Sequence, residues 1–296
     1  MQNVVVFGAG GSIGSHVVAA LKATGYQTTT VSRRPTGKNL ALDFRSPELR
    51  QALANAYAVI NLAGAPIIGK RLTAAYRQEI EDSRSGLTAR LVACMAELAD
   101  RPQVLINASA TGYYGTHEIT DALFDESSPA GSGFWAELCT SWEAAATPAE
   151  SLGIRTVLIR TGLVLTEDSH GTLAKLALPF RLFVGGPIGV RESWRSWIHI
   201  DDEVGIIMQA LSDPKIRGAV NATAPEPLRN DQLAAQLGHF LHRPDWFPVP
   251  EFIVRLAFAE VGEVITRGKR IVPTSALQSG YRFEYPNFQS ALADLL

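Results

Sequence analysis

Residues 4–14 read VVVFGAGGSIG, and this stretch decides the fold. Four residues with high strand propensity, Val4 to Phe7, run directly into a cluster of glycines. A segment compatible with a helix follows from Ser12 to Thr24. A strand, a glycine turn and a helix in immediate succession are typical of an α/β protein that binds a pyrophosphate. We therefore predict a doubly wound parallel sheet, the Rossmann fold, with a nucleotide site behind its first strand.

Each glycine of this turn has its own expected role. Gly8 permits the tight turn after the strand, Gly11 leaves room for a phosphate to approach the backbone, and Gly14 lets the helix pack closely. The open N–H groups of the first helical turn, at Ser12 and Ile13, would then face the anion. The spacing is G-x-x-G-x-x-G, whereas the G-x-G-x-x-G of most dehydrogenases would need glycine at Ile13. By itself, the pattern also fits an ordinary turn followed by a helix.

The composition indicates a soluble globular protein without affinity for nucleic acid. Of the 296 residues, 46% are hydrophobic and 19% are charged, and the formal net charge is −2. No apolar stretch approaches the roughly 18 residues of a membrane span, and we expect no secretory signal and no membrane partner. Cys94 and Cys139 show no zinc-site spacing, so we expect no metal, no disulfide and a cytoplasmic location.

Short apolar strands alternate with amphipathic helices up to about residue 165, where the nearly continuous apolar strands indicate a parallel sheet covered on both faces. The expected strands are Val4–Phe7, Thr28–Val31, Ala58–Leu62, Val104–Ala108 and Thr156–Arg160. The expected helices are Ser12–Thr24, Thr73–Ala99 and Trp135–Glu150.

After Leu165 the pattern becomes irregular. The stretch SWIHIDD, from Ser196 to Asp202, returns to a strand and the start of a helix, and Ala219–Ala222 is a further expected strand. From Pro225 onward the chain is helical and rich in proline. We expect residues 1–165 and 196–224 to form the Rossmann domain, and 166–195 and 225–296 a smaller C-terminal lobe. This lobe would close over the carboxyl edge of the sheet, where ligands of doubly wound sheets bind.

Two arginines stand at the end of the second strand. In a dinucleotide site this position meets the adenosine ribose, where an acid holds a free 2′-hydroxyl and arginines hold a 2′-phosphate. Ser32, Arg33 and Arg34 offer a hydroxyl and two guanidinium groups, and no acid accompanies them. We therefore expect NADP(H) rather than NAD. The alternative is that both arginines are solvated loop charges.

Two more segments carry expected contacts to the cofactor. After the third long strand, Leu62, Ala63 and Gly64 are small enough for a ribose or nicotinamide to pass close to the backbone, although a plain turn has the same composition. Asp43 follows the short apolar stretch LAL. This aspartate either accepts a hydrogen bond from adenine or caps a turn.

Together these motifs resemble the extended short-chain dehydrogenase/reductase superfamily, and more narrowly its atypical "epimerase family" branch of nucleoside-diphosphate-sugar epimerases. GxxGxxG, NLAG, SATGYYG (Ser109–Gly115) and WIHIDD carry the wider resemblance. PFRLFVGGPIG (Pro179–Gly189) and GYRFEYP (Gly280–Pro286) are similar to later landmarks of the branch, so the resemblance covers essentially the whole chain. It implies bound NADP(H) and a poorly defined substrate. It also places Arg84 near the cofactor phosphates; the alternative is an exposed helix arginine.

The chain departs from the superfamily at its catalytic pair. Extended members place a serine after the fifth strand, matched here by Ser109, and a Tyr-x-x-x-Lys about 25 residues later, in which the tyrosine is the general acid/base. In this chain that count reaches Phe134, and the lysine position is Leu138. We therefore expect the usual pair to be missing. Tyr113 and Tyr114, the nearest phenols in sequence, are the candidate proton donors beside Ser109.

Two charged motifs have simpler interpretations than catalysis. We expect His199 to be a hydrogen-bonded core residue, and Asp201 or Asp202 to be the N-cap of the following helix. Glu143 is expected to cap a helix or to pair with a cation, and the neighbouring aromatic residues to lie in the core.

Two functions are consistent with these observations. The first is an NADP(H)-dependent oxidoreductase or nucleotide-sugar epimerase acting on a small molecule. The second is a non-catalytic NADP(H)-binding sensor or scaffold with a link to cell division, as in some relatives of the branch. An intact nucleotide site fits both functions, and a missing Tyr/Lys pair favours the second. The substrate and the oligomeric state stay open.

Overall fold

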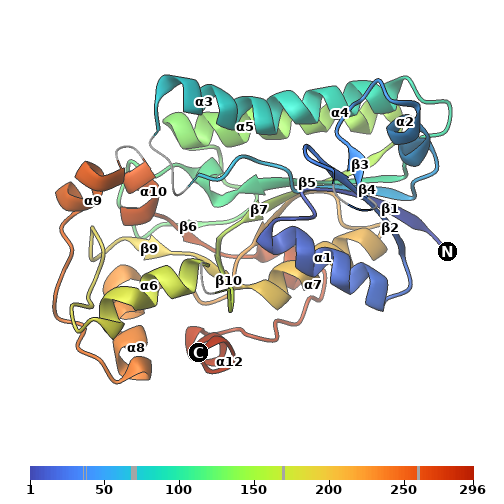
Figure 1. Ribbon diagram of the computed structural model, residues 1–296. Coiled ribbons are helices and arrows are strands. Elements are labelled where there is room, and N and C mark those ends of the chain that lie inside the picture. Colours follow the sequence, from blue (N-terminus) through green and yellow to red (C-terminus); the bar gives the residue numbers. More distant parts are fainter. Residues whose placement is uncertain (36, 38, 68–71, 169–170, 259–260) are drawn as a thin grey trace.

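The computed structural model describes residues 1–35, 37, 39–67, 72–168, 171–258 and 261–296. The central strands are β1 (Asn3–Phe7), β2 (Gln27–Ser32), β3 (Leu40–Ala41), β4 (Ala58–Asn61), β5 (Val104–Ala110), β7 (Arg155–Thr161) and β11 (Gly218–Ala222). They form one seven-stranded sheet in the order β11-β7-β5-β4-β1-β2-β3, with parallel neighbours throughout (Figure 1). The predicted Rossmann fold is therefore confirmed.

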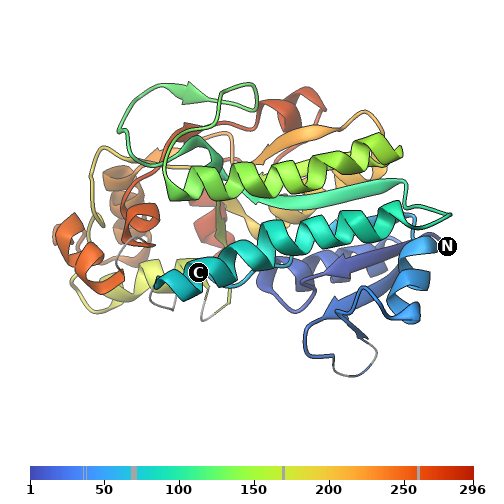
Figure 2. The same cartoon turned by 90° about the horizontal axis from the view of Figure 1, so that it is seen from above.

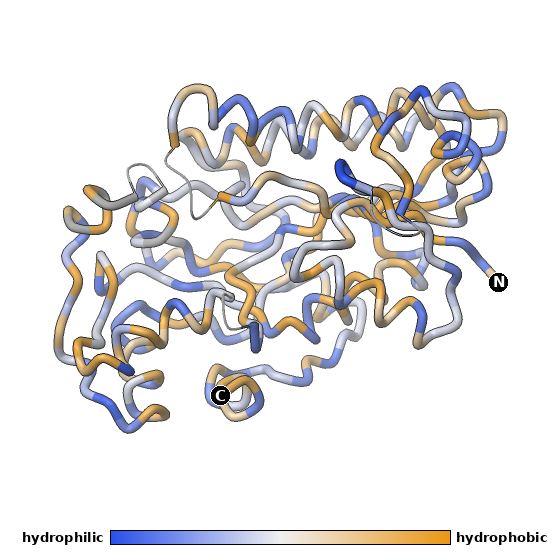
Figure 3. The backbone as a smooth tube through the Cα atoms, viewed as in Figure 1, coloured by the Kyte–Doolittle hydropathy of each residue, from blue (hydrophilic) through white to orange (hydrophobic). Residues whose placement is uncertain are grey.

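Helices cover both faces of this sheet (Figure 1), and the view from above looks onto the face that α4 and α5 cover (Figure 2). One face carries α1 (Ser12–Ala23) and α7 (Ile200–Ser212), and the other carries α2 (Pro47–Ala54), α4 (Leu87–Ala96) and α5 (Phe134–Ala146). Because strand side chains alternate, Val4 and Val6 pack toward the first face and Val5 toward the second. Burial on both sides explains why β1, most of β4 and the first part of β5 are apolar residue after residue, as the hydropathy of the central strands in Figure 3 shows.

The long helix expected over 73–99 contains an interruption. It consists of α3 (Ala74–Glu81), a π-helical turn at Asp82–Gly86, and α4, which ends at Ala96. Single π turns inside helices occur frequently at functional sites. The expected helix 135–150 is α5 followed by a 3₁₀ segment, Thr147–Leu152, which contains Pro148.

The C-terminal part of the chain supplies a third apolar cluster. It joins α6 (Thr172–Arg181), α8 (Asn230–Leu241) and α12 (Phe288–Leu295) around the buried indole of Trp197. The sequence pattern did not predict α6, because Pro179 lies in its last turn and glycines flank the helix. The remaining helices are α9 (Glu251–Phe258), α10 (Val261–Thr266) and α11 (Thr274–Gln278).

Short strands connect this part of the chain to the sheet. The pairs are β10 (Trp197–His199) with β8 (Leu163–Leu165), β9 (Trp194–Arg195) with β12 (Leu228–Arg229), and β13 (Arg270–Ile271) with β6 (Leu123–Phe124). Within the described residues, no helix is both long and apolar enough to cross a membrane.

The helix cap expected at Asp201 or Asp202 is wrong. The N-cap of α7 is His199, whose Nδ1 accepts the backbone N–H of Asp201 at 3.1 Å. As expected, the His199 side chain is buried and hydrogen-bonded. Its ring also stacks on Tyr285, with 3.7 Å between ring centroids.

Asp202 fastens the C-terminal tail to α7. Its buried carboxylate accepts the N–H groups of Glu284 at 2.9 Å and Tyr285 at 3.0 Å, and the hydroxyl of Tyr281 at 3.0 Å. The sequence shows a capping residue type at this position, but it does not show partners that arrive about 80 residues later. SWIHIDD and GYRFEYP are therefore two halves of one structural contact.

We expect Asp202→Ala to lower the free energy of unfolding by about 2–4 kcal/mol, because three donors lose the buried, charged acceptor that they share. Urea denaturation followed by circular dichroism measures this change. The matched control is Asp201→Ala, whose side chain is 53% exposed and should contribute less than about 1 kcal/mol. Equal losses in the two variants would contradict the role given to Asp202.

Candidate cofactor and active site

The turn between β1 and α1 lies at the carboxyl edge of the sheet. Gly8 has a φ of +80°, and a Cβ on it would lie 2.7 Å from the carbonyl carbon of Leu62, beyond the end of β4. A Cβ on Gly14 would lie 2.2 Å from the carbonyl oxygen of Gly8. The fold therefore requires both of these glycines. At Gly11 the nearest atom would be 3.4 Å away, so the packing of the chain leaves room there, where the phosphate approach is predicted.

The amino end of α1 is open to an anion. Its N-cap residue is Gly11, which has no side chain that could accept a hydrogen bond from the first N–H groups of the helix. The first turn contains no acidic residue. The backbone N–H groups of that turn, together with the helix dipole, attract negative charge.

A cavity of about 390 Å³ lies against the same turn. It is lined by Ser12, Ile13, Val164, Thr166, Asp168, Gly171 and Thr172. The Thr166 hydroxyl is buried and has no hydrogen-bond partner among the described residues. Asp168 accepts the Ser12 hydroxyl at 2.8 Å, so a carboxylate lies at the helix end where an anion would bind.

The second strand presents its arginines to solvent. Arg33 and Arg34 are exposed, and the Ser32 hydroxyl accepts the backbone N–H of Arg34 at 3.2 Å. The Asp43 carboxylate accepts the N–H of Arg45 at 2.9 Å, so it does cap a turn. Contacts of these side chains with a cofactor stay predictions.

Arg84 is a buried residue rather than an exposed helix arginine. It lies in the π-helical turn, and its guanidinium donates to the carbonyls of Ala65 at 3.0 Å and Ile80 at 3.4 Å. A Cβ on Gly64 would lie 3.0 Å from the guanidinium carbon, so this glycine lets the loop after β4 pass close to it. Burial lowers the pKa of Arg84. The side chain thus supports the segment Leu62–Gly64 that is predicted to meet the ribose.

A buried polar network joins the strand ends at the middle of the sheet. Ser109, at the end of β5, donates to Glu143 of α5 at 2.6 Å. Glu143 holds Arg160 of β7 through two hydrogen bonds, of 2.8 and 2.9 Å. Arg160 donates to the Tyr114 hydroxyl at 3.0 Å, which donates to Asn221 of β11 at 2.7 Å. Burial opposes the charge on Arg160, but the hydrogen bonds and charge of Glu143 raise its pKa above the usual value.

This network distinguishes the two tyrosines. Burial raises the pKa of Tyr114 to about 12, and both of its hydrogen bonds are structural. Tyr113 is only half-buried, and the Arg160 guanidinium lies 3.4 Å from the centre of its ring. Of the candidate donors, Ser109 is engaged by Glu143 and Tyr114 is enclosed, whereas Tyr113 keeps access to solvent. The catalytic role of each stays a prediction.

The helix after the network carries apolar side chains at the two counted positions. Its sequence, FWAELCTSWEAAA, contains neither tyrosine nor lysine. Phe134 and Leu138 pack in one cluster with Ala65, Tyr76 and Ile80, beside the loop that follows β4. The neighbouring aromatic side chains of Trp135 and Trp142 are buried as expected.

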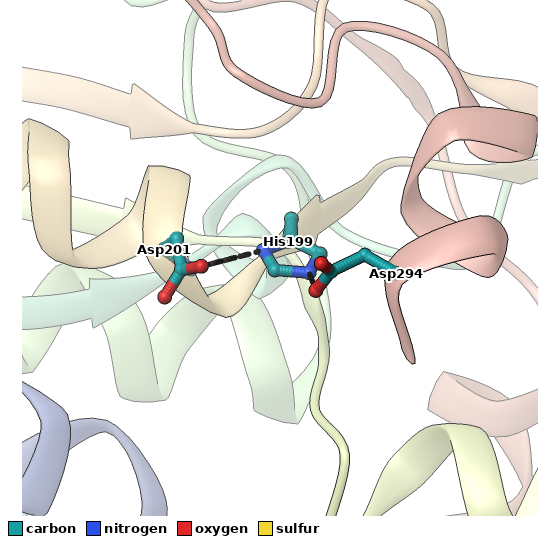
Figure 4. Close-up of side chains that lie close together, drawn as sticks. All are labelled: His199, Asp201 and Asp294. Atoms are coloured by element: carbon teal, nitrogen blue, oxygen red, sulfur yellow. Dashed lines mark hydrogen bonds and ion pairs between the residues drawn. The ribbon is translucent and has the colours of Figure 1, made fainter. Parts of the chain in front are cut away.

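Among the described residues, His199, Asp201 and Asp294 form a group with metal-ligand spacing. Figure 4 shows the two carboxylates on opposite sides of the ring, with Asp201 near Nδ1 and Asp294 near Nε2. Because Nδ1 accepts a backbone N–H, the neutral ring carries its proton on Nε2, 3.2 Å from Asp294. A metal on Nε2 would require the proton on Nδ1, which instead accepts the N–H of Asp201. This arrangement fits a structural clamp between α7 and α12 better than a metal centre.

The sequence reasoning missed Arg160, Asn221, Thr166 and Asp168. Arg160 and Asn221 do leave a signal, because each is a buried polar residue that directly follows the apolar run of its strand. Thr166 and Asp168 leave none. They lie in the irregular segment after the last regular strand, and the turn that they face is about 150 residues earlier in the chain.

Comparison with known proteins identifies the family of the chain. Residues 4–222 match the NAD dependent epimerase/dehydratase family, and residues 249–295 match a domain of unknown function, DUF1731. The chain belongs to this epimerase family. The chloroplastic epimerase family protein SDR39U1 homolog of Arabidopsis thaliana is 37% identical over 100% of this chain and 87% of its own length. Epimerase family protein YfhF of Bacillus subtilis is 34% identical over 100% of this chain and 98% of its own.

Solved structures of the family share the whole fold. Human epimerase family protein SDR39U1, crystallised with NADPH, superposes with a TM-score of 0.88 at 30% identity and 99% coverage of both chains. A nucleoside-diphosphate sugar epimerase of Corynebacterium glutamicum gives a TM-score of 0.80 at 29% identity, over 99% of this chain and 57% of that one. The family resemblance found in the sequence is confirmed.

We expect Glu143→Gln to lower the free energy of unfolding by about 3–5 kcal/mol, because Arg160 stays buried without its counter-charge. Thermal and urea denaturation measure the loss. Glu137→Gln is the matched control, since this residue is exposed on the same helix. A Glu143→Gln protein as stable as the control would show that Arg160 is held by its other contacts.

Proposed function

We propose that this protein binds NADP(H) at the glycine turn and is an oxidoreductase or epimerase-like enzyme of low turnover. The open amino end of α1, with room at Gly11, carries the proposal. The exposed arginines after β2 and the absence of an acid beside them favour the 2′-phosphate form of the cofactor. The NADPH bound by the human relative supports the same choice.

The residues of the site have distinct expected roles. The N–H groups at Ser12 and Ile13 bind the pyrophosphate, for which Gly11 leaves room, because the Gly11 N–H itself donates to the Gly8 carbonyl. Ser32, Arg33 and Arg34 bind the 2′-phosphate, and Leu62, Ala63 and Gly64 pass beside a ribose. When bound, the nicotinamide donates or accepts a hydride. Ser109 would orient a substrate oxygen, and Tyr113 would transfer the proton.

A second candidate function has its own observation. The positions at which relatives would carry the Tyr/Lys pair are apolar and packed, and the hydroxyl of Ser109 already donates to Glu143. Such a site suits a sensor of the NADPH/NADP ratio or a scaffold. Steady NADPH consumption with a small ketone identifies an oxidoreductase. An epimerase consumes no net cofactor, because it returns the hydride to its substrate, and it is identified by interconversion of a nucleoside-diphosphate sugar. A sensor binds the cofactor and shows neither activity.

The cofactor preference is the direct test of the proposed site. We expect NADPH to bind more than tenfold tighter than NADH, because each charge-assisted hydrogen bond to the 2′-phosphate contributes about 1.5–3 kcal/mol. Arg33→Glu should weaken NADPH far more than NADH in titration calorimetry. Arg90→Glu, which makes the same charge change on the exposed side of α4, should alter neither affinity. Equal affinities of the wild-type protein for both cofactors would refute the assignment.

The carboxylate of Asp168 should oppose cofactor binding. A carboxylate and one phosphate charge about 5 Å apart repel by about 1–3 kcal/mol at the edge of a protein. Asp168→Asn should therefore tighten NADPH and NADH about tenfold each, whereas Glu167→Gln, an exposed neighbour with the same charge change, should have little effect. Titration calorimetry at low salt measures both. Weaker binding by Asp168→Asn would mean that Asp168 holds the cofactor instead.

A further inference from the structure

One histidine lies at the amino end of α5, outside the buried network. The His117 side chain is 52% exposed, and its Nδ1 lies 2.9 Å from the carboxylate of Glu263 in α10. Gly133 is the residue before α5, and a Cβ on it would collide with the other ring nitrogen, Nε2. This glycine therefore leaves the room in which the imidazole lies. The next residue, Phe134, is the position at which relatives would carry the tyrosine.

The carboxylate that holds this ring is itself fixed. Glu263 is buried and also accepts the hydroxyl of Thr116 at 2.8 Å. The carbonyl of His117 accepts Arg267 at 3.1 Å, and the carbonyl of the following residue accepts Lys269 at 2.8 Å. A carboxylate accepts hydrogen bonds, so Nδ1 carries a proton and Nε2 is the nitrogen that exchanges one with its surroundings. A histidine oriented in this way is typical of acid–base sites.

The turn that borders His117 also holds Tyr113. The N–H of Gly131 donates to the carbonyl of Tyr113 at 2.9 Å, and His117 contacts the same turn at Gly133. Two residues of chain span at most about 7 Å. Tyr113 and His117 therefore lie at the two ends of one short segment, and both side chains keep access to solvent.

Other charged groups face the ring from the elements around it. Arg267 pairs with Glu251 of α9 through hydrogen bonds of 3.0 and 3.1 Å, Lys269 donates to Glu118, and α5 adds Glu137 in its first turn. Carboxyl, guanidinium and ammonium groups ordinarily titrate far from neutral pH, whereas imidazole changes its charge between pH 5 and 8. The imidazole is therefore the group of this cluster that suits proton exchange in that range.

A phenol that transfers a proton must be recharged in every turnover. Tyrosine ordinarily loses its proton near pH 10, so a phenolate formed during a reaction at neutral pH has to regain one from a neighbouring group or from water. The helix α5 supplies no lysine for this purpose. An imidazole near the phenol, in contact with solvent and fixed through its other nitrogen, fits the need.

We propose that His117, oriented by Glu263, carries protons between Tyr113 and solvent. This inference rests on the proposed function. In the reductive direction the carbonyl carbon of the substrate takes the hydride, and its oxygen takes the phenol proton of Tyr113. The Nε2–H of the imidazolium then gives its proton to the phenolate, and solvent restores the imidazolium. In the oxidative direction each transfer runs in reverse.

The first test follows the His117 ring itself, by NMR of the full-length protein labelled at the histidine Cε1. The signal of this ring is the one that His117→Gln removes. Tyr113→Phe should shift the midpoint of its pH titration, because the two side chains no longer exchange a proton, and saturating NADP⁺ should shift it too. Tyr26→Phe, at a half-buried tyrosine between α1 and β2, should leave the midpoint unchanged.

The second test measures NADPH-dependent reduction of 2-butanone across the same pH range. His117→Ala should lower turnover at least about tenfold and keep NADPH affinity, because a positioned proton-transfer group contributes roughly 10²–10⁴ in rate. Added imidazole should restore the turnover, since free imidazole can carry protons but cannot replace a structural contact. His239→Ala, at an exposed histidine on α8, should behave as the wild type.

A His117 signal that responds neither to Tyr113→Phe nor to NADP⁺ overturns the proposal, because the pair with Glu263 is then a structural contact only. Equal turnover in the wild type and in His117→Ala overturns it as well, and so does a loss that imidazole does not restore. NADPH affinity is measured separately by calorimetry. Absence of NADPH binding rejects the proposed function, whereas normal binding with an unresponsive His117 rejects this inference alone.

Discussion

The buried ion pair between Glu143 and Arg160 ties together the elements on which the candidate site is built. It joins α5 to β7, engages Ser109 at the end of β5, and reaches β11 through Tyr114 and Asn221. A buried pair is stable only when both charges keep their hydrogen bonds, so each member constrains the others. The network therefore positions the strand ends and the tyrosines next to them.

That constraint has a consequence for chemistry. A serine that donates to a buried carboxylate is oriented, and a phenol with two buried hydrogen bonds stays neutral and in place. The network thus provides rigidity, and of the two tyrosines beside it Tyr113 keeps access to solvent whereas Tyr114 is buried. With apolar residues at Phe134 and Leu138, the site combines a well-formed nucleotide turn with few groups able to move a proton. A site of this kind is consistent with an enzyme of low turnover and with a cofactor sensor.

The C-terminal part of the chain completes the site from outside the sheet. Asp202 and His199 hold the tail against α7, and α6 lies between the third apolar cluster and the cavity beside Ser12. α6 buries one face in the third apolar cluster and exposes Leu178 and Leu182 on the other. The family match over residues 249–295 shows that this part is itself a recurring unit.

The sequence by itself determined the sheet, its parallel order of strands and helices, and the glycine turn, because these depend on local spacing and on residues adjacent in the chain. It also indicated the family and the position of Ser109 at the end of β5, but not Arg160 or Asn221 in the neighbouring strands. Only the tertiary structure decided which of these residues are free to act. The partners of Ser109, Asp202 and Ser12 come from 34, 82 and 156 residues away. Such contacts arise when separate elements pack, and a side chain's own sequence neighbourhood contains no record of them. α6 was not predicted either. Glycines at its ends and Pro179 in its last turn interrupt the helical spacing of its apolar residues, and the packing of Leu173 and Phe180 beside α8 is visible only in the folded structure.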